Sequence, residues 1–158
     1  MTRYVLDTNI LVGYLRGADY ARRAENQYRL SEPPNISVIS VVTAGEIHSL
    51  AIQFGWGKKK KRRLKQIMRE FPAIDINTTE VISTYAEIDA YSQGKMPGSP
   101  LPQGMTARNM GKNDLWIAAT TGVVQADLIT TDHHFDHLDG IFFEVRYIDQ
   151  SKGKERTH

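Results

Sequence analysis

Four acidic residues far apart in the sequence share one kind of position, at junctions where predicted strands end and helices begin. They are Asp7, Glu46, Asp114 and Asp132. In an alternating α/β chain, the carboxyl ends of parallel strands lie at one edge of the sheet, where ligands bind. Carboxylates gathered there would repel one another unless a hard divalent cation with oxygen ligands lay between them. The set therefore predicts metal-dependent phosphodiester chemistry.

Three of these acids have a second explanation, because aspartate is among the best residues for capping a helix, an effect of about 1 kcal/mol. Asp7 precedes a predicted helix, and Asp132 precedes a short helical turn through Phe135. Either Asp114 or its neighbour Asn113 could cap the helix that starts there. A carboxylate at a helix start can be both a cap and a metal ligand, so both explanations stay open.

Glu46 is harder to explain by capping. Val42, Leu50 and Phe54 share its i, i+4 row, which places this carboxylate in an apolar stripe of a predicted helix. Burial of an unpaired carboxylate is costly. We therefore expect Glu46 to face a cation, either a basic side chain or a metal ion.

Short apolar runs alternate with stretches of helical periodicity along the chain. They predict the strands and helices that would position these acids. We expect strands at 4–6, 36–39, 73–76, 128–130 and 142–147, and helices at about 10–16, 20–30, 42–54, 58–71, 78–93 and 114–121. This alternation predicts one α/β domain over residues 1–150, a three-layer α/β/α sandwich with a mostly parallel five-stranded sheet. We expect a long exposed loop at 95–111 and a frayed polar tail at 151–158.

The composition excludes several classes of site. The 158 residues are 41% hydrophobic and include no cysteine, so a core can form but a disulfide or a thiolate zinc site cannot. No apolar stretch approaches the roughly 20 residues that cross a bilayer, and a strand-like run follows Met1 directly, so we expect a cytoplasmic protein with no membrane partner. The glycine and lysine patterns of dinucleotide and nucleoside triphosphate sites are missing.

Positive charge is concentrated in what we call the basic segment: Lys58, Lys59, Lys60, Lys61, Arg62 and Arg63. The net charge of the chain is +2, and the other residues together carry −4 once these six charges are set aside. A cationic segment near an anionic pocket suits a polyanion that is held at one place and cut at another. A solvated helix face is the alternative. Arg108 and Lys112 flank the pair at 113–114 and are further candidates for phosphate contacts.

A histidine-based transition-metal site is a competing hypothesis. His133 and His137 are four residues apart and could share a helical face, and Asp136 lies between them. Residues 132–134 (DHH) resemble the signature of the DHH phosphoesterases, but the further histidine and aspartate motifs of those enzymes are missing. Surface histidines in a turn are the preferred explanation.

The ordered motifs resemble the PIN-domain nucleases, and among them the VapC-like toxins of toxin–antitoxin pairs. The matching segments are 5–9 (VLDTN), 43–47 (TAGEI), 113–119 (NDLWIAA) and 128–135 (LITTDHHF). Each motif alone is weak, but their order and spacing agree over nearly the whole chain. The family often has an acid directly before the phenylalanine of the last segment, where this chain has His134.

The resemblance implies an α/β/α sandwich with catalytic, metal-binding carboxylates at one end. Because Mg²⁺ takes only one or two direct carboxylates, we expect Asp7 and Asp114 to bind the ion directly, and Glu46 and Asp132 to bind it directly or through water. The resemblance also implies supporting residues, which are Thr8, Asn9, Asn113 and Thr130.

The expected reaction needs no side-chain nucleophile, because one or two Mg²⁺ ions, or Mn²⁺ in their place, can activate water and neutralise a phosphate. The resemblance implies an endoribonuclease that acts as a toxin on RNA, forms a homodimer and is blocked by a cognate antitoxin. Two alternatives stay open. A non-catalytic RNA-binding module would gain nothing from four acids, and a metal phosphoesterase for small substrates would not need the basic segment.

Overall fold

The described part of the chain, residues 1–151, contains five short strands in one parallel sheet. In this computed structural model the strands are β1 (Arg3–Leu6), β2 (Ile36–Ser40), β3 (Ala73–Ile74), β4 (Asp127–Thr130) and β5 (Val145–Tyr147), in the order β3-β2-β1-β4-β5. The predicted five-stranded α/β sheet is confirmed, and it is wholly parallel. Of the tail predicted at 151–158, residues 152–158 lie outside the described residues.

The two edge strands are shorter than predicted. β3 ends at Ile74, and β5 begins at Val145 rather than at residue 142. The chain before β5 turns back on itself, because the Gly140 amide donates to the Phe143 carbonyl and the Phe142 amide donates to the Leu138 carbonyl. Those backbone groups are therefore not free to extend the sheet.

The helices begin close to their predicted positions. They are α1 (Thr8–Arg16), α2 (Asp19–Tyr28), α3 (Val41–Gln53), α4 (Lys58–Glu70), α5 (Thr79–Ser92) and α6 (Lys112–Val123), with a 3₁₀ helix, η1, at His133–Leu138. Asp7 and Asp132 cap α1 and η1 with their carboxylates, as predicted. The prediction that Asn113 or Asp114 caps α6 is wrong, because α6 begins earlier with Gly111 at its cap position and no side-chain cap.

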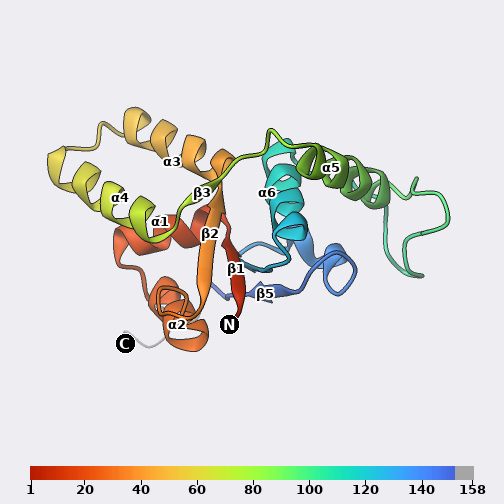
Figure 1. Ribbon diagram of the computed structural model, residues 1–158, viewed down its shortest axis with the longest axis horizontal. Helices are drawn as coiled ribbons and strands as arrows, with labels where there is room; N and C mark the ends of the chain where they lie inside the picture. The colour runs from red at the N-terminus through yellow and green to blue at the C-terminus, as the bar shows by residue number, and fades with distance from the viewer. Residues whose placement is uncertain (152–158) are drawn as a thin grey trace.

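Helices cover both faces of the sheet (Figure 1). Alternate residues of β1 point to opposite faces, so Tyr4 and Leu6 pack with α1, α2 and α4, whereas Val5 packs with α5 and α6. The two hydrophobic cores on either side of one sheet confirm the three-layer α/β/α architecture. No helix within residues 1–151 is long and apolar enough to cross a membrane.

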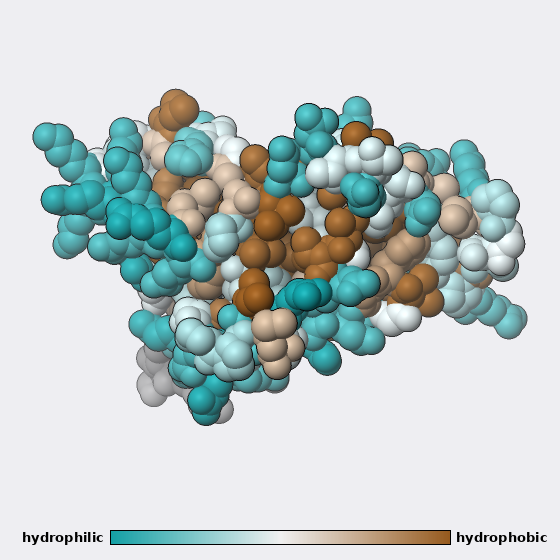
Figure 2. All heavy atoms as spheres, viewed as in Figure 1, coloured by the Kyte–Doolittle hydropathy of each residue, from teal (hydrophilic) through white to brown (hydrophobic). Residues whose placement is uncertain are grey.

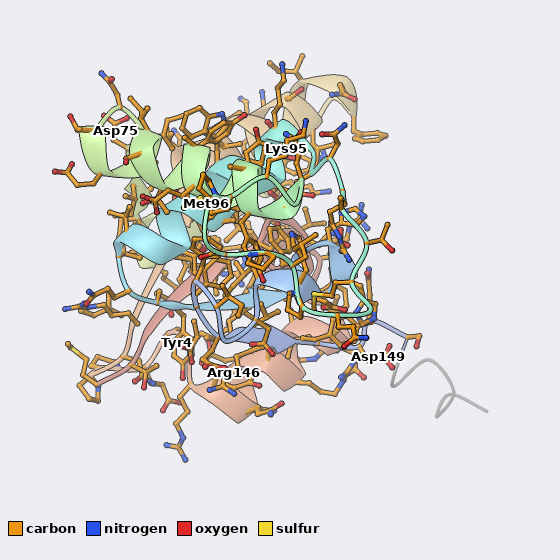
Figure 3. The ribbon with its side chains drawn as sticks, turned by 90° about the vertical axis from the view of Figure 1, so that its right-hand side faces the viewer. Tyr4, Asp75, Lys95, Met96, Arg146 and Asp149 are labelled. Atoms are coloured by element: carbon orange, nitrogen blue, oxygen red, sulfur yellow. The ribbon has the colours of Figure 1, made fainter. Side chains whose placement is uncertain are left out.

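The stretch between α5 and α6 contains no helix or strand, so the long loop predicted at 95–111 is confirmed. It projects beyond the end of α5 (Figure 1), and Lys95 and Met96 mark its start in Figure 3. The loop returns to the body of the protein at Arg108, whose amide donates to the Ser92 carbonyl at 2.8 Å. Its last residues lead directly into α6 and therefore set the position of Asp114.

Candidate functional site

Asp7 lies at the carboxyl end of β1, directly beside the end of β4. Its amide donates to the Ile129 carbonyl at 2.9 Å, which continues the ladder between the two strands. One carboxylate oxygen accepts the Thr8 amide at 2.8 Å, and the other accepts the Thr130 hydroxyl at 2.7 Å. With 5% of its surface exposed, Asp7 is buried. Both of its oxygens are thus held by neutral donors.

Burial raises the pKa of Asp7 from 3.8 to about 6. The hydrogen bonds from Thr130 and Thr8 oppose this shift, whereas the charges of Asp114 and Asp132 add to it. Three of the four acids are therefore close enough to influence one another. A cation bound beside Asp7 would favour its ionised form and lower this pKa.

Glu46 joins the site through Thr8. The Thr8 hydroxyl donates to Glu46 Oε1 at 2.9 Å and lies 3.2 Å from the Thr43 hydroxyl. Of the two partners expected for Glu46, a basic side chain is not found, since within residues 1–151 no Lys, Arg or His forms an ion pair with it. Its row on α3 is only partly buried, and Phe54 at the end of that row is 70% exposed.

The carboxylate of Glu46 lines an open cavity of about 580 Å³ between α1, α3 and the start of α6. Thr8, Asn9 and Asn113 line the same cavity. Residues from three of the four sequence motifs therefore meet at one place, and Glu46 and Asp114 are not on opposite ends of the molecule.

Asp114 and Asp132 are bridged by a histidine. His134 Nδ1 lies 3.1 Å from Asp114 Oδ2 and 3.0 Å from Asp132 Oδ2. Burial raises the pKa of Asp114, the contact with His134 lowers it, and the charge of Asp132 raises it again. The Thr130 hydroxyl also accepts the Asp132 amide at 3.0 Å, so this one side chain connects Asp7 with Asp132.

The side chains of residues 1–151 do not form a ready-made metal cage, since no three His, Asp or Glu residues are grouped so that they could hold an ion. The imidazole of His134 contacts both Asp114 and Asp132, so a cation shared by these two acids would compete with it. The donor set still suits a hard cation, because it consists of carboxylate oxygens and includes a buried acid with a raised pKa. Which acids bind metal stays a prediction.

The candidate phosphate-binding residues lie in different places. Arg108 lines a cavity of about 380 Å³ with Asp114 and His134, so it lies beside the acids. Lys112 is exposed at the start of α6. The basic segment forms the first turns of α4, where hydrophilic surface gathers (Figure 2), and Lys60 lies 4.1 Å from the centre of the Trp56 ring.

The histidines do not form a shared metal-binding face. Residues 133–138 are a 3₁₀ helix with three residues per turn, so side chains four apart point in different directions. His133 is exposed and contacts Asp136 at 2.9 Å, whereas His137 is only 2% exposed. The description of all three as surface histidines is therefore wrong for His137.

Sequence analysis missed a buried pair between His137 and Ser92. Ser92 Oγ lies 2.7 Å from His137 Nε2, and burial lowers the pKa of His137 to about 4. The pair joins the end of α5, where the long loop begins, to η1. The two residues are 45 apart in the sequence, and no local pattern marks them as partners.

Comparison with known proteins places the whole arrangement in a recognised fold. The sequence profile described as PIN domain matches residues 4–141. No curated protein sequence matches the chain.

Several solved structures are similar. A structure of VapBC2 from Rickettsia felis, bound to a promoter DNA fragment, is 20% identical, covers 94% of this chain and 100% of that chain, and has a TM-score of 0.72. VapBC-1 from nontypeable Haemophilus influenzae is 24% identical over 92% and 98%, with a TM-score of 0.66. A toxin–antitoxin complex from Klebsiella pneumoniae is 22% identical over 87% and 92%, with a TM-score of 0.59. The TM-scores establish a shared fold, and identities this low establish nothing beyond it.

Proposed function

Because this chain belongs to the PIN domain family, we propose that it is a Mg²⁺-dependent endoribonuclease and the toxin of a toxin–antitoxin pair. The observation that carries the proposal is the buried carboxylate of Asp7, which has a raised pKa and further acids beside it at the carboxyl edge of a parallel sheet. Three similar structures are VapBC or toxin–antitoxin complexes, which supports the toxin role.

Each acid has a proposed task. Asp7 and Asp114 bind the ion directly, and Glu46 and Asp132 bind it directly or through water. When bound, Mg²⁺ neutralises charge on the phosphate and makes an attacking water more acidic. The protein's own contribution is orientation, since hydroxyl groups fix the carboxylates of Asp7 and Glu46 before any substrate arrives.

The proposed substrate is RNA. Arg108 is well placed to contact a phosphate near Asp114, because both line one cavity. The basic segment on α4 provides a second, separate cationic surface that can follow the backbone of a longer strand. We further propose that residues 1–150 form one nuclease domain, that the protein works in the cytoplasm as a homodimer, and that its antitoxin blocks the acids with a basic side chain.

The test is a cleavage assay on single-stranded RNA with Mg²⁺, with Mn²⁺ and with a chelator. Cleavage that requires the metal supports the proposal. Metal-dependent cleavage of bis-p-nitrophenyl phosphate without cleavage of RNA would instead identify a small-molecule phosphoesterase. RNA binding without any cleavage would identify a binding module. For the toxin role, expression should arrest growth, and Asp7→Asn should relieve the arrest.

A further inference from the structure

Two stacked rings lie at the same edge of the sheet as the acids. The ring centres of His133 and Tyr147 are 4.0 Å apart, with an angle of 22° between their planes. His133 directly follows Asp132 in the sequence, and Tyr147 is the last residue of β5. The ring pair therefore lies next to the candidate metal ligand Asp132, at the carboxyl end of the edge strand β5.

The register of the sheet places this ring pair close to Asp7. Thr130 of β4 pairs with Tyr147 of β5, and Leu128 pairs with Val145 two residues earlier. Leu128 and Val145 both contact the core on the α5 and α6 face. Because side chains alternate along a strand, Thr130 and Tyr147 start out on that same face. Neighbouring strands are about 4.8 Å apart, and β5 lies directly beside β4, so the tyrosine is one strand spacing from Thr130, whose hydroxyl binds Asp7.

The ring pair is exposed yet fixed in orientation. The side chain of His133 is 65% exposed, and Tyr147 is 39% exposed. His133 Nδ1 contacts Asp136 Oδ2 at 2.9 Å, which sets the rotation of the imidazole. The Tyr14–Phe71 pair, in contrast, belongs to a hydrophobic core. An exposed, oriented pair of flat rings adds little to core packing and leaves ring surface open to a ligand.

Flat rings beside a phosphodiesterase site suit one chemical group in particular. Proteins that bind single-stranded nucleic acid stack the bases on aromatic and histidine side chains, while other groups handle the phosphates. In this protein the acids with their cation, together with Arg108, would handle a phosphate. Beyond them, the ring pair offers a surface for the base.

We propose that His133 and Tyr147 form a base-stacking platform that holds the nucleobase next to the scissile phosphate of single-stranded RNA. This inference rests on the proposed ribonuclease function and adds the substrate contact that positions the strand. Every base has a flat face, so the platform fixes the place of a nucleotide without selecting its identity.

The experiment removes the base and the ring separately. Short single-stranded RNAs with an abasic site at each position in turn are bound to the wild-type protein in chelator, where no cleavage occurs, and their dissociation constants are measured by fluorescence anisotropy. The same series is repeated with His133→Ala, Tyr147→Ala and Tyr147→Phe. Phe54→Ala is the matched control, since Phe54 is an exposed aromatic residue at the end of α3.

We expect one abasic position to weaken wild-type binding about tenfold, the size of one stacking contact. His133→Ala and Tyr147→Ala should each raise the dissociation constant of intact RNA about tenfold. In these two variants, removal of the base at that position should cause no further loss of affinity. Tyr147→Phe and Phe54→Ala should behave like the wild type. Thermal unfolding shows that each variant is folded, and the His133 side chain is 65% exposed, so its removal leaves the core intact.

Two outcomes would overturn the platform. In one, the wild-type protein binds intact and abasic RNAs equally well at every position. In the other, the abasic penalty persists unchanged in both alanine variants. Cleavage in Mg²⁺ is measured separately, so active protein with no stacking contact would refute the platform alone. A stacking contact in protein that never cleaves RNA would refute the ribonuclease alone.

Discussion

The candidate site has two halves that are held in different ways. The inner half, Asp7 with Glu46, is bound by hydroxyl and amide groups and has no basic partner within residues 1–151. The outer half, Asp114 with Asp132, is bridged by the imidazole of His134. The inner carboxylates therefore have no cationic partner within residues 1–151, whereas the outer pair contacts an exposed imidazole. If the site binds a metal ion as we propose, the inner half would create the demand for it, and an ion shared by Asp114 and Asp132 would compete with His134.

The largest expected effect comes from the inner half. Asp7→Asn removes the charge that we propose binds Mg²⁺ directly, at nearly constant shape. Loss of several kcal/mol of metal-ion stabilisation corresponds to a fall in kcat/KM of roughly a thousandfold or more. The measurement is RNA cleavage in Mg²⁺, with the exposed acid variant Asp19→Asn as control. Cleavage near the wild-type rate by folded Asp7→Asn would refute the assignment.

The raised pKa of Asp7 predicts a pH effect on the stability of the metal-free protein. Between about pH 4 and pH 6 the folded state holds more protons than the unfolded chain, so this group makes stability fall as pH rises through that window. At roughly 1.4 kcal/mol per pKa unit, the full effect is about 3 kcal/mol. The free energies of unfolding of the wild type and of Asp7→Asn are measured by denaturant unfolding. Between about pH 4 and pH 7 their difference should change by this amount in favour of the variant.

Mg²⁺ provides the control for that pH effect. A saturating ion should pair with the ionised carboxylate and restore the relative stability of the wild type near pH 7. A stability difference that does not depend on pH would show that burial does not perturb Asp7.

Thr130→Val separates the two halves by removing the hydroxyl that connects them. The substitution leaves Asp7 Oδ2 and the Asp132 amide without that partner, at a cost of about 2 kcal/mol in the free energy of unfolding. Thr121→Val is a matched control, because Thr121 is also buried but its hydroxyl only donates to the Ile117 carbonyl within α6. Equal losses of stability in the two variants would contradict a special role for Thr130.

The smallest expected effect lies in the outer half. His134→Ala removes the side chain that competes with a cation for Asp114 and Asp132, so the Mn²⁺ concentration that gives half-maximal cleavage should fall about threefold, or roughly 0.6 kcal/mol. The exposed variant His48→Ala serves as control. A higher metal requirement in His134→Ala would mean that the imidazole supports the site instead of blocking it.

The elements and their layers follow from local features of the sequence. Apolar runs and helical spacing are local properties, so the five strands, the alternation with helices and the capping roles of Asp7 and Asp132 could be read directly from it. The start of α6 could not, because Gly111, Asn113 and Asp114 are all acceptable near a helix start, and the carboxylate of Asp114 is turned towards His134 instead of the helix amides.

The contacts between distant side chains depend on the folded arrangement of the strands and helices. Thr8 with Glu46, Thr130 with Asp7, and Ser92 with His137 are pairs separated by 38, 123 and 45 residues. Such contacts depend on which strand ends are neighbours in the sheet, and hydrophobic periodicity carries no information about that order. The stacking of His133 on Tyr147 has the same origin, since β4 and β5 must lie side by side before the two rings can touch.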